Sequence, residues 1–444
     1  MAQKPARLIH TSFYNLYFDI TQTIHLCFEK IELTNIDPKT FKDEVMEAVF
    51  SKIEEAVDHI HPRRLIFIAF DGIPPAIKLQ KQIYTRTSKN RLFERPSDKE
   101  YSKKYDKNLI TPGTSFMEKL GDYIRYRLSE KLTYNDHWED IRILLSDTHM
   151  PGTGEWKIMS YIRSLEVPPP GSPELRHMIW GSDRNLILMG LLCEDSNILF
   201  TEGITYTEEE TPRNIFKVVH AGTLREAIEK EYAFLKAQDG FEYDTYSLIR
   251  DYVLLNVIMG TSFLRYPRSL NRLSESMKVV LDAYKNFLLE SNGHLYENQT
   301  INHNRLGFFF EKLLIPMRDL YSAEKANDII QEFKKFNINS ISTGTISRTE
   351  QIKSSQKTRE RKIMAEEYIR GIHWTMEYFQ SNIVSWTWYY PFYRLTPAIF
   401  ELIEIQDLEV PIFDLGEPMN IYVYIQKVFP DFNVLVDQLA SEVL

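Results

Sequence analysis

Short apolar runs that alternate with helical patterns are the feature of the first 205 residues that most limits the fold. Longer segments such as Lys42–His59 and Gly113–Leu132 have the spacing of amphipathic helices. Apolar strands separated by helices are typical of a parallel sheet covered by helices on both faces. The sequence therefore predicts an α/β fold for residues 1–205. Its expected strands are Leu16–Asp19, Leu65–Phe70, Ile141–Leu145, Met178–Trp180 and Ile198–Phe200.

Acidic residues follow several of these runs closely. The carboxyl ends of parallel strands meet at one edge of a sheet, so side chains placed there converge. Carboxylate oxygens at such an edge can bind Mg²⁺ or Mn²⁺, and bound ions activate water for phosphodiester hydrolysis. One such acid alone is more often a helix cap or a surface charge. Several in succession favour a metal site, whose candidate catalytic residues and metal ligands are Asp19, Asp71, Glu155 and Asp183.

A basic helix shortly after Asp71 predicts a phosphate-binding surface. Lys78, Gln82 and Arg86 recur every four residues and so share one helical face. Lys, Gln and Arg side chains on a common face can hold a phosphate group through charge-assisted hydrogen bonds. The basic residues that continue from Lys89 to Lys107 are better explained as a solvated surface.

Aromatic residues provide a second way to hold a nucleic acid. His25 lies shortly after Asp19. Three tryptophans lie far downstream: Trp374, Trp386 and Trp388. Rings of this kind stack on unpaired bases without reading their sequence. For most of the Trp and Tyr residues, however, a place in the core is the better expectation.

The rest of the chain divides by composition into four segments. Residues 206–245 contain an acidic loop, Glu208–Glu210, and a predicted helix at Leu224–Leu235, and they are expected to link two larger parts. Residues 246–342 are predicted to be mainly helical, with an apolar helix at Asp251–Gly260. Residues 343–357, rich in Ser, Thr, Gln and Lys, are expected to form a flexible connector. Residues 358–444 return to a helical pattern before the aromatic block Ser385–Pro391.

Composition excludes several classes of protein. The net charge of −9 argues against a surface that is basic throughout, although it allows a local basic channel. Cys27 and Cys193 provide neither a disulfide framework nor a zinc site. The first residues lack the apolar core of a signal peptide, and no apolar run is long enough to span a membrane. We therefore expect a soluble protein of the cytoplasm with no membrane partner. The lysines of residues 99–107 leave a nuclear location open.

Taken in order, these motifs resemble those of the XRN family of 5′→3′ exoribonucleases along nearly the whole chain. The resemblance implies a parallel-sheet, PIN/FEN-like nuclease core followed by a mainly helical second conserved region that packs on the core. The segments that carry it are Asn15–Asp19 with His25, Phe70–Gln82, Ile110–Met117, Pro151–Arg163, Trp180–Leu186, Asp251–Leu264, Tyr368–Trp374, Ser385–Pro391, Phe413–Pro418 and Val428–Pro430.

The resemblance also implies roles for individual residues. The four acids named above would bind Mg²⁺ or Mn²⁺ and support the removal of nucleotides one at a time. The residues that would contact the 5′-monophosphate and first bases of a single-stranded RNA are Lys78, Gln82, Arg86, His25 and Trp386.

Three departures from the family pattern bear on catalysis, since the family has acids where this chain has Thr153, Asn185 and Ser262. The loss of three negative charges should leave Mg²⁺ or Mn²⁺ weakly bound at one site, or not bound. Removing one preorganised electrostatic group costs roughly 10²–10³ in rate, so three such losses should nearly abolish turnover. We therefore expect a pseudonuclease that binds 5′-monophosphate RNA and has lost most or all of its 5′→3′ activity.

Two alternatives stay open at this point. The chain could be a working exoribonuclease with a reduced metal site. It could instead be a protein-interaction scaffold that no longer binds RNA, although the basic face of Lys78 and Arg86 argues against that alternative. The sequence names no protein partner.

Overall fold

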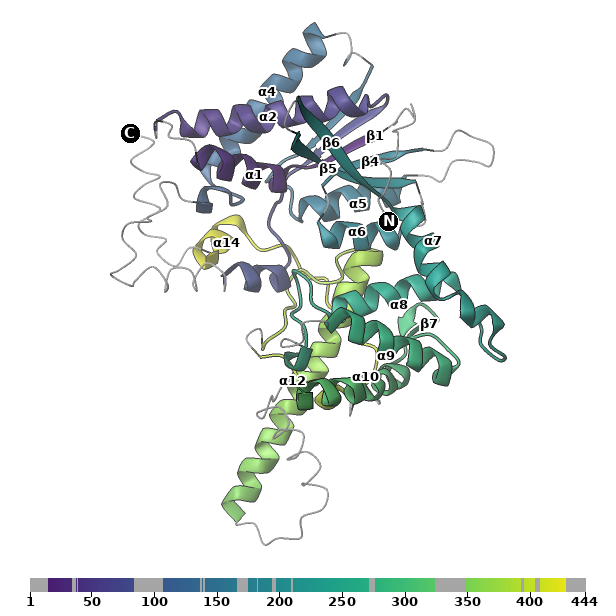
Figure 1. Ribbon diagram of the computed structural model, residues 1–444. Helices are drawn as coiled ribbons and strands as arrows, with labels where there is room; N and C mark the ends of the chain where they lie inside the picture. The colour runs from purple at the N-terminus through teal and green to yellow at the C-terminus, as the bar shows by residue number, and fades with distance from the viewer. Residues whose placement is uncertain are drawn as a thin grey trace. The chain divides into compact units, whose positions relative to one another are not determined.

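The structure of the protein is a computed structural model, shown in Figure 1. For residues 202–208, 211–217, 318–323 and 348–358 the structure describes the backbone alone. The residues described are 15–33, 37, 39–83, 107–135, 138, 140–165, 175–181, 183–193, 197–208, 211–270, 276–323, 348–392, 395–403 and 408–428.

The chain divides into two compact units. The first consists of residues 1–75, 82–224 and 417–444, and the second of residues 76–81 and 225–416. The five segments expected from the sequence divide the chain more finely, and their boundaries stay predictions.

The first unit is built on a six-stranded sheet with the order β3-β2-β1-β4-β5-β6. The pairs among the first five strands are parallel, and β6 is antiparallel to β5. This mostly parallel sheet confirms the predicted α/β fold, and all five predicted strands are present. The strands are β1 (Asn15–Asp19), β2 (Leu65–Ala69), β3 (Arg142–Ser146), β4 (His177–Trp180), β5 (Ile198–Glu208) and β6 (Thr211–His220).

Helices cover both faces of this sheet. One face carries α1 (Ile20–Glu32), α2 (Phe41–Ile60) and α4 (Ser115–Tyr134), and the other carries α5 (Gly154–Ser164) and α6 (Arg184–Leu191). The side chains of β1 pack against the helices on both faces of the sheet, because successive side chains of a strand point to opposite faces. Phe18 packs into the cluster formed with the first set of helices, whereas Tyr17 lies against Tyr161 of α5. The strand is therefore buried on both sides, as its continuous apolar sequence requires.

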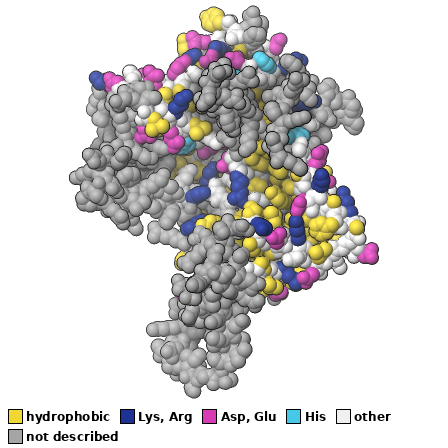
Figure 2. Space-filling model, viewed as in Figure 1, with side chains coloured by type: hydrophobic (Ala, Val, Ile, Leu, Met, Phe, Trp, Pro, Cys, Tyr) yellow, Lys and Arg dark blue, Asp and Glu magenta, His cyan; other side chains and the backbone are white. Residues whose placement is uncertain are grey.

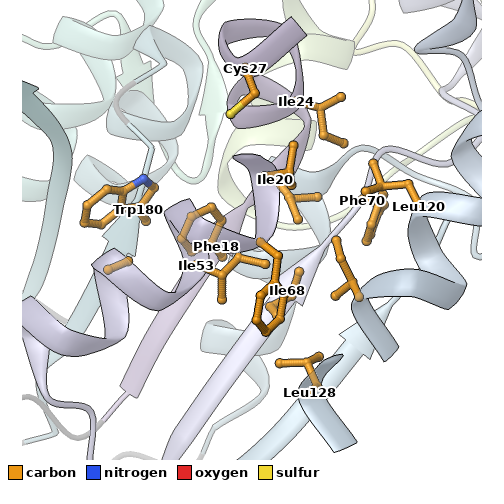
Figure 3. Packing of buried hydrophobic residues seen from close by; sticks show 14 of the residues in the cluster. Phe18, Ile20, Ile24, Cys27, Ile53, Ile68, Phe70, Leu120, Leu128 and Trp180 are labelled. Carbon is orange, nitrogen blue, oxygen red and sulfur yellow. The ribbon is translucent and has the colours of Figure 1, made fainter. Parts of the chain in front are cut away.

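The core between β1, β2 and the first set of helices is shown in Figure 3. The rings of Phe18 and Trp180 stack at 5.7 Å with an interplanar angle of 12°. Since Phe18 and Trp180 are paired residues of β1 and β4, this contact fixes the two strand ends beside each other. The ends of these strands are where the candidate site lies.

The second unit is mainly helical, as predicted. Its core includes Phe263, Trp374 and Tyr378, whose rings lie 4.6–5.5 Å apart between centroids. The helices are α8 (Thr245–Ile258), α9 (Ser276–Ser291), α10 (His303–Ala323), α12 (Arg348–Gln380) and α13 (Ile399–Ile403), with a short hairpin of β7 (Tyr296–Glu297) and β8 (Thr300–Ile301). Two further helices, α7 (Ala221–Glu231) and α14 (Ile421–Val428), complete the description of the longer elements.

Two of the expected connecting segments contain more regular secondary structure than the sequence pattern indicated. The expected linker 206–245 begins as an antiparallel hairpin in which β5 pairs with β6 from Leu199↔His220 to Glu208↔Thr211. The acidic run beside this strand end favoured the prediction of a loop, although β6 contains β-branched residues. The expected connector 343–357 is helical from Arg348 onward, as part of α12. Its residues lack Gly and Pro between 348 and 357, and Lys, Arg and Gln are good helix formers.

In the part of the chain that the structure describes, every helix is too short or too polar to cross a membrane.

Candidate functional site

The start of α5 brings together the acids that end β1 and β2. The Gly154 N–H donates a hydrogen bond of 2.7 Å to Oδ1 of Asp71. A Cβ atom on Gly154 would lie 2.9 Å from Oδ1 of Asp19 and 3.0 Å from the carbonyl oxygen of Ala69. Both carboxylates therefore lie against this glycine, and a larger residue would not fit without movement. The predicted convergence of Asp19 and Asp71 is present.

Glu155 reaches the same region by a different route from the one expected. It lies in the first turn of α5, where it is buried, and does not follow a strand directly. The acid that follows β3 immediately is Asp147. Glu155 is thus held by the helix, and its place depends on how α5 begins.

Thr153 is one of the three neutral residues singled out in the sequence, and it lies directly before the start of α5. It is 1% exposed and is the N-cap of α5. Its Oγ1 accepts a hydrogen bond of 3.3 Å from the Trp156 N–H and donates one of 3.5 Å to Oε1 of Glu155. This hydroxyl is therefore engaged in starting the helix and in holding the neighbouring carboxylate.

Asp183 and Asn185 lie at the start of α6, after β4. Oδ1 of Asp183 accepts a hydrogen bond of 2.8 Å from the Asn185 N–H, so Asp183 is the N-cap of this helix. Asp183 is exposed, whereas Asn185 is buried. Asp183 therefore has the role of a helix cap, which is the common role of a single acid after a strand.

In the part of the chain that the structure describes, no three His, Cys, Asp or Glu side chains lie close enough together to hold a metal ion. Asp19 and Asp71 still present two carboxylates on either side of Gly154. Mg²⁺ is commonly held by one or two carboxylates and keeps several waters. The donors at α5 are therefore chemically suited to one hydrated Mg²⁺ or Mn²⁺ ion.

Lys157 is a residue of this region that sequence reasoning missed. It is 6% exposed, and its Nζ donates hydrogen bonds of 2.9 Å to the carbonyl oxygens of Phe70 and Asp147. Burial lowers the pKa of Lys157 to about 8, against the opposing effect of the negative charges of Asp71 and Asp147. Its position one helical turn after Gly154 was the only signal that it faces the same sheet edge.

Two of the predicted RNA-binding residues belong to the second unit. Residues 76–83 are helical, and the Ala76 N–H donates a hydrogen bond of 3.0 Å to the carbonyl oxygen of Trp386. Nζ of Lys78 lies 5.8 Å from the ring centroid of Phe263. The helix that carries Lys78 thus begins at the backbone of Trp386, and both side chains are half-buried.

The other predicted residues are placed as follows. Oε1 of Gln82 accepts a hydrogen bond of 3.2 Å from the Tyr424 hydroxyl. His25 lies on the exposed side of α1. Ser262 is half-buried in the turn after α8, in the second unit. Arg86 lies outside the described residues.

The charge on the surface is mixed. The face drawn in Figure 2 carries Lys and Arg side chains in separate groups among acidic and hydrophobic ones. This mixture agrees with the net charge of −9. RNA binding would therefore depend on local groups of basic residues such as the helix of Lys78.

Two family models match the chain. The one described as XRN 5′-3′ exonuclease N-terminus matches residues 2–201, and the one described as Xrn1 helical domain matches residues 347–434. The chain belongs to the XRN family. The first XRN segment contains all four retained acids, and the second contains Trp386. The resemblance inferred from the motifs is thereby confirmed, whereas the roles of individual residues stay predictions.

Several XRN relatives are similar over much of this chain. It is 24% identical to the 5′-3′ exoribonuclease 1 of Homo sapiens, in a match that covers 94% of this chain and 29% of that protein. It is 31% identical to the 5′-3′ exoribonuclease 1 of Schizosaccharomyces pombe, over 70% of this chain and 24% of that protein. It is 23% identical to the 5′-3′ exoribonuclease 2 homolog of Drosophila melanogaster, over 94% of this chain and 59% of that protein. The chain thus spans well under two thirds of the length of each of these relatives.

Proposed function

We propose that this chain of the XRN family binds single-stranded RNA by its 5′-monophosphate end and has lost most or all of the 5′→3′ exonuclease reaction. The observation that carries the proposal is the environment of Thr153. A buried, neutral hydroxyl caps α5 directly before Gly154, against which Asp19 and Asp71 lie, and it bonds to Glu155. A site that must hold a divalent cation gains from negative charge there, and this side chain supplies none.

The retained groups support RNA binding better than hydrolysis. A bound metal ion would supply activated water and charge stabilisation for the cleavage step. For its part, the chain offers Asp19 and Asp71, with one oxygen of Asp71 already bonded to the Gly154 N–H. Lys78 and Trp386, by contrast, lie on adjoining segments of the second unit, one suited to a phosphate and the other to a base.

One alternative has a specific observation in its favour. Asp19 and Asp71 both lie against Gly154, and these two carboxylates could hold a single ion once RNA phosphates complete its coordination. This alternative describes an exoribonuclease with a reduced metal site.

A comparison of two RNAs separates these functions. The purified protein is mixed with a single-stranded RNA that carries either a 5′-monophosphate or a 5′-hydroxyl, in Mg²⁺ and in Mn²⁺. The proposal expects tighter binding of the monophosphate RNA, without loss of nucleotides. Progressive shortening of that RNA, abolished by Glu155→Gln, would establish the active enzyme instead.

The same assay tests whether the basic helix carries the binding. Lys78→Ala should weaken binding of the monophosphate RNA about tenfold or more, because a charge-assisted phosphate contact is lost. The matched control is Lys81→Ala, an exposed lysine three residues further along the helix. Equal binding of both RNAs, unchanged by Lys78→Ala, would overturn the proposal and favour a scaffold.

A further inference from the structure

Lys157 is tied to the ends of two neighbouring strands. Its Nζ bonds to the carbonyl oxygen of Phe70, directly before Asp71, and to that of Asp147, directly after β3. The side chain is buried, so its charge lies in a region that water screens poorly. A buried ammonium needs partners of opposite charge or polarity, and these two carbonyls provide part of them.

The charges around Lys157 identify its acidic partner. Both Asp71 and Asp147 act on the ammonium electrostatically. Asp147 has a second positive neighbour, since its Oδ2 lies 3.2 Å from Nη2 of Arg125. Asp71 instead accepts hydrogen bonding from the Gly154 N–H at the N-terminal end of the helix that carries Lys157. The helix therefore donates one hydrogen bond to the Asp71 carboxylate and binds, through Lys157, the carbonyl oxygen of Phe70 directly before it.

We propose that Lys157 is a positioning residue that acts as a built-in counter-cation for Asp71 and so lowers the affinity of the acids at α5 for divalent metal ions. While Lys157 is protonated, its positive charge near the carboxylates of Asp19 and Asp71 replaces part of the charge that a metal would neutralise. It also repels an incoming ion, and the repulsion is strong because the region is buried. The strand ends and Asp71 then keep their positions without a bound metal.

This inference deepens the proposed function and rests on it in one respect, namely that the acids at α5 descend from a metal site. It gives a second reason, besides the neutral residues, for weak metal binding. Its test uses Mn²⁺ alone and no RNA, so its failure would leave the proposed RNA-end binding unaffected. Failure of RNA binding would likewise leave the role of Lys157 standing.

The test is a calorimetric titration of the metal-free protein with Mn²⁺. Lys157→Met keeps the length of the side chain and removes its charge, and we expect Mn²⁺ to bind this variant at least about tenfold more tightly than the unaltered protein. Lys157→Arg keeps the charge and should bind Mn²⁺ as weakly as the unaltered protein. Lys119→Met, on the exposed side of α4, is the matched control and should change nothing.

Each outcome decides the proposal. Equal Mn²⁺ affinities for Lys157→Met and the unaltered protein would overturn it, as would equal changes in the Met and Arg variants. If Lys157→Met does not fold in EDTA, Asp71→Asn decides. That variant leaves the ammonium without its carboxylate, so its melting temperature in EDTA should fall. An unchanged melting temperature would overturn the proposal.

Discussion

The Nε2 atoms of His303 and His373 lie 2.7 Å apart in the second unit, so one imidazole must donate a proton and the other must accept it. Nδ1 of His303 is bonded to the carbonyl oxygen of Leu408, and it must carry the donor proton there. His303 is therefore the acceptor at Nε2, and both rings are neutral in the folded chain. The pair joins the start of α10 to the C-terminal part of α12.

This pair predicts a loss of stability in mild acid. Burial, reinforced by the neighbouring His303, lowers the pKa of His373 to about 3, and burial also lowers the pKa of His303. The unfolded chain takes up these protons near pH 6.5, whereas the folded chain does not. Stability should be complete above about pH 6.5 and fall by about 1.4 kcal/mol per pH unit from His373 below it.

Thermal melts between pH 5 and pH 8 measure this effect. His373→Gln should flatten the pH dependence of the melting temperature relative to the unaltered protein. His25→Gln, on the exposed side of α1, should leave that dependence unchanged. A His373→Gln curve parallel to that of the unaltered protein would contradict the prediction.

Asp251 is expected to be needed for stability, and Asp251→Asn tests this. Its carboxylate is fully buried and accepts hydrogen bonds from the Tyr284 hydroxyl and from the N–H groups of Leu295 and Tyr296, at 2.6–2.8 Å. The amide NH₂ of Asn would face donors instead of accepting from them. We expect a loss of about 3–5 kcal/mol in the free energy of unfolding, measured with urea. Asp282→Asn, exposed on α9, should cost less than about 0.5 kcal/mol.

Gly154→Ala should disturb the candidate site, whereas Gly121→Ala should not. The new methyl group at Gly154 would press on Asp19 and on the Ala69 carbonyl, at 2.9 and 3.0 Å. At Gly121, inside α4, a Cβ meets no atom within 4 Å. We expect the first variant to lose stability and the second to gain about 0.5–1 kcal/mol from its helix propensity. Parallel chemical denaturation curves would show whether the two changes have opposite signs.

If neutral residues at positions 153, 185 and 262 account for the proposed loss of activity, introducing acids there should give metal-dependent cleavage. The combined variant Thr153→Glu, Asn185→Asp and Ser262→Asp should shorten 5′-monophosphate RNA in Mn²⁺. Its rate should be at least about 10²-fold higher than that of the unaltered chain. Thr153→Glu also removes a helix cap, at a cost of about 1 kcal/mol, so folding is checked by circular dichroism. The same variant with Glu155→Gln is the control. A folded triple variant that leaves the RNA intact would show that other residues limit the reaction.

The fold was predictable to the extent that it follows from local pattern. The five parallel strands were found because buried strands read as unbroken apolar runs. β6 was missed because the acidic run Glu208–Glu210 directly before it indicated a loop, although β6 pairs with β5 along its whole length. The first turns of α12 were missed because polar residues without Gly or Pro suit a helix as well as a connector.

The proximity of Asp19 and Asp71 was predictable from the sequence, but the groups that contact them were not. Strand register alone places Asp19 beside Ala69 and therefore near Asp71. The hydrogen bond from Gly154 and the buried Lys157 depend on how α5 packs against two strands, which no spacing in the sequence encodes. Glu155 was assigned to a strand end because the sequence does not show how many residues separate the end of β3 from the start of α5.

The strand order also governs when the first unit can fold during synthesis. β1 is central, and its two neighbours are made later: Asn15 pairs with Leu65 on one side and with His177, 162 residues further on, on the other. One edge of β1 therefore stays open until β4 has left the ribosome. Contacts of such long sequence separation slow folding and leave apolar strands exposed in the meantime. A nascent chain that stops before residue 177 would lack the strand that closes its sheet, and would depend on chaperones to stay out of aggregates.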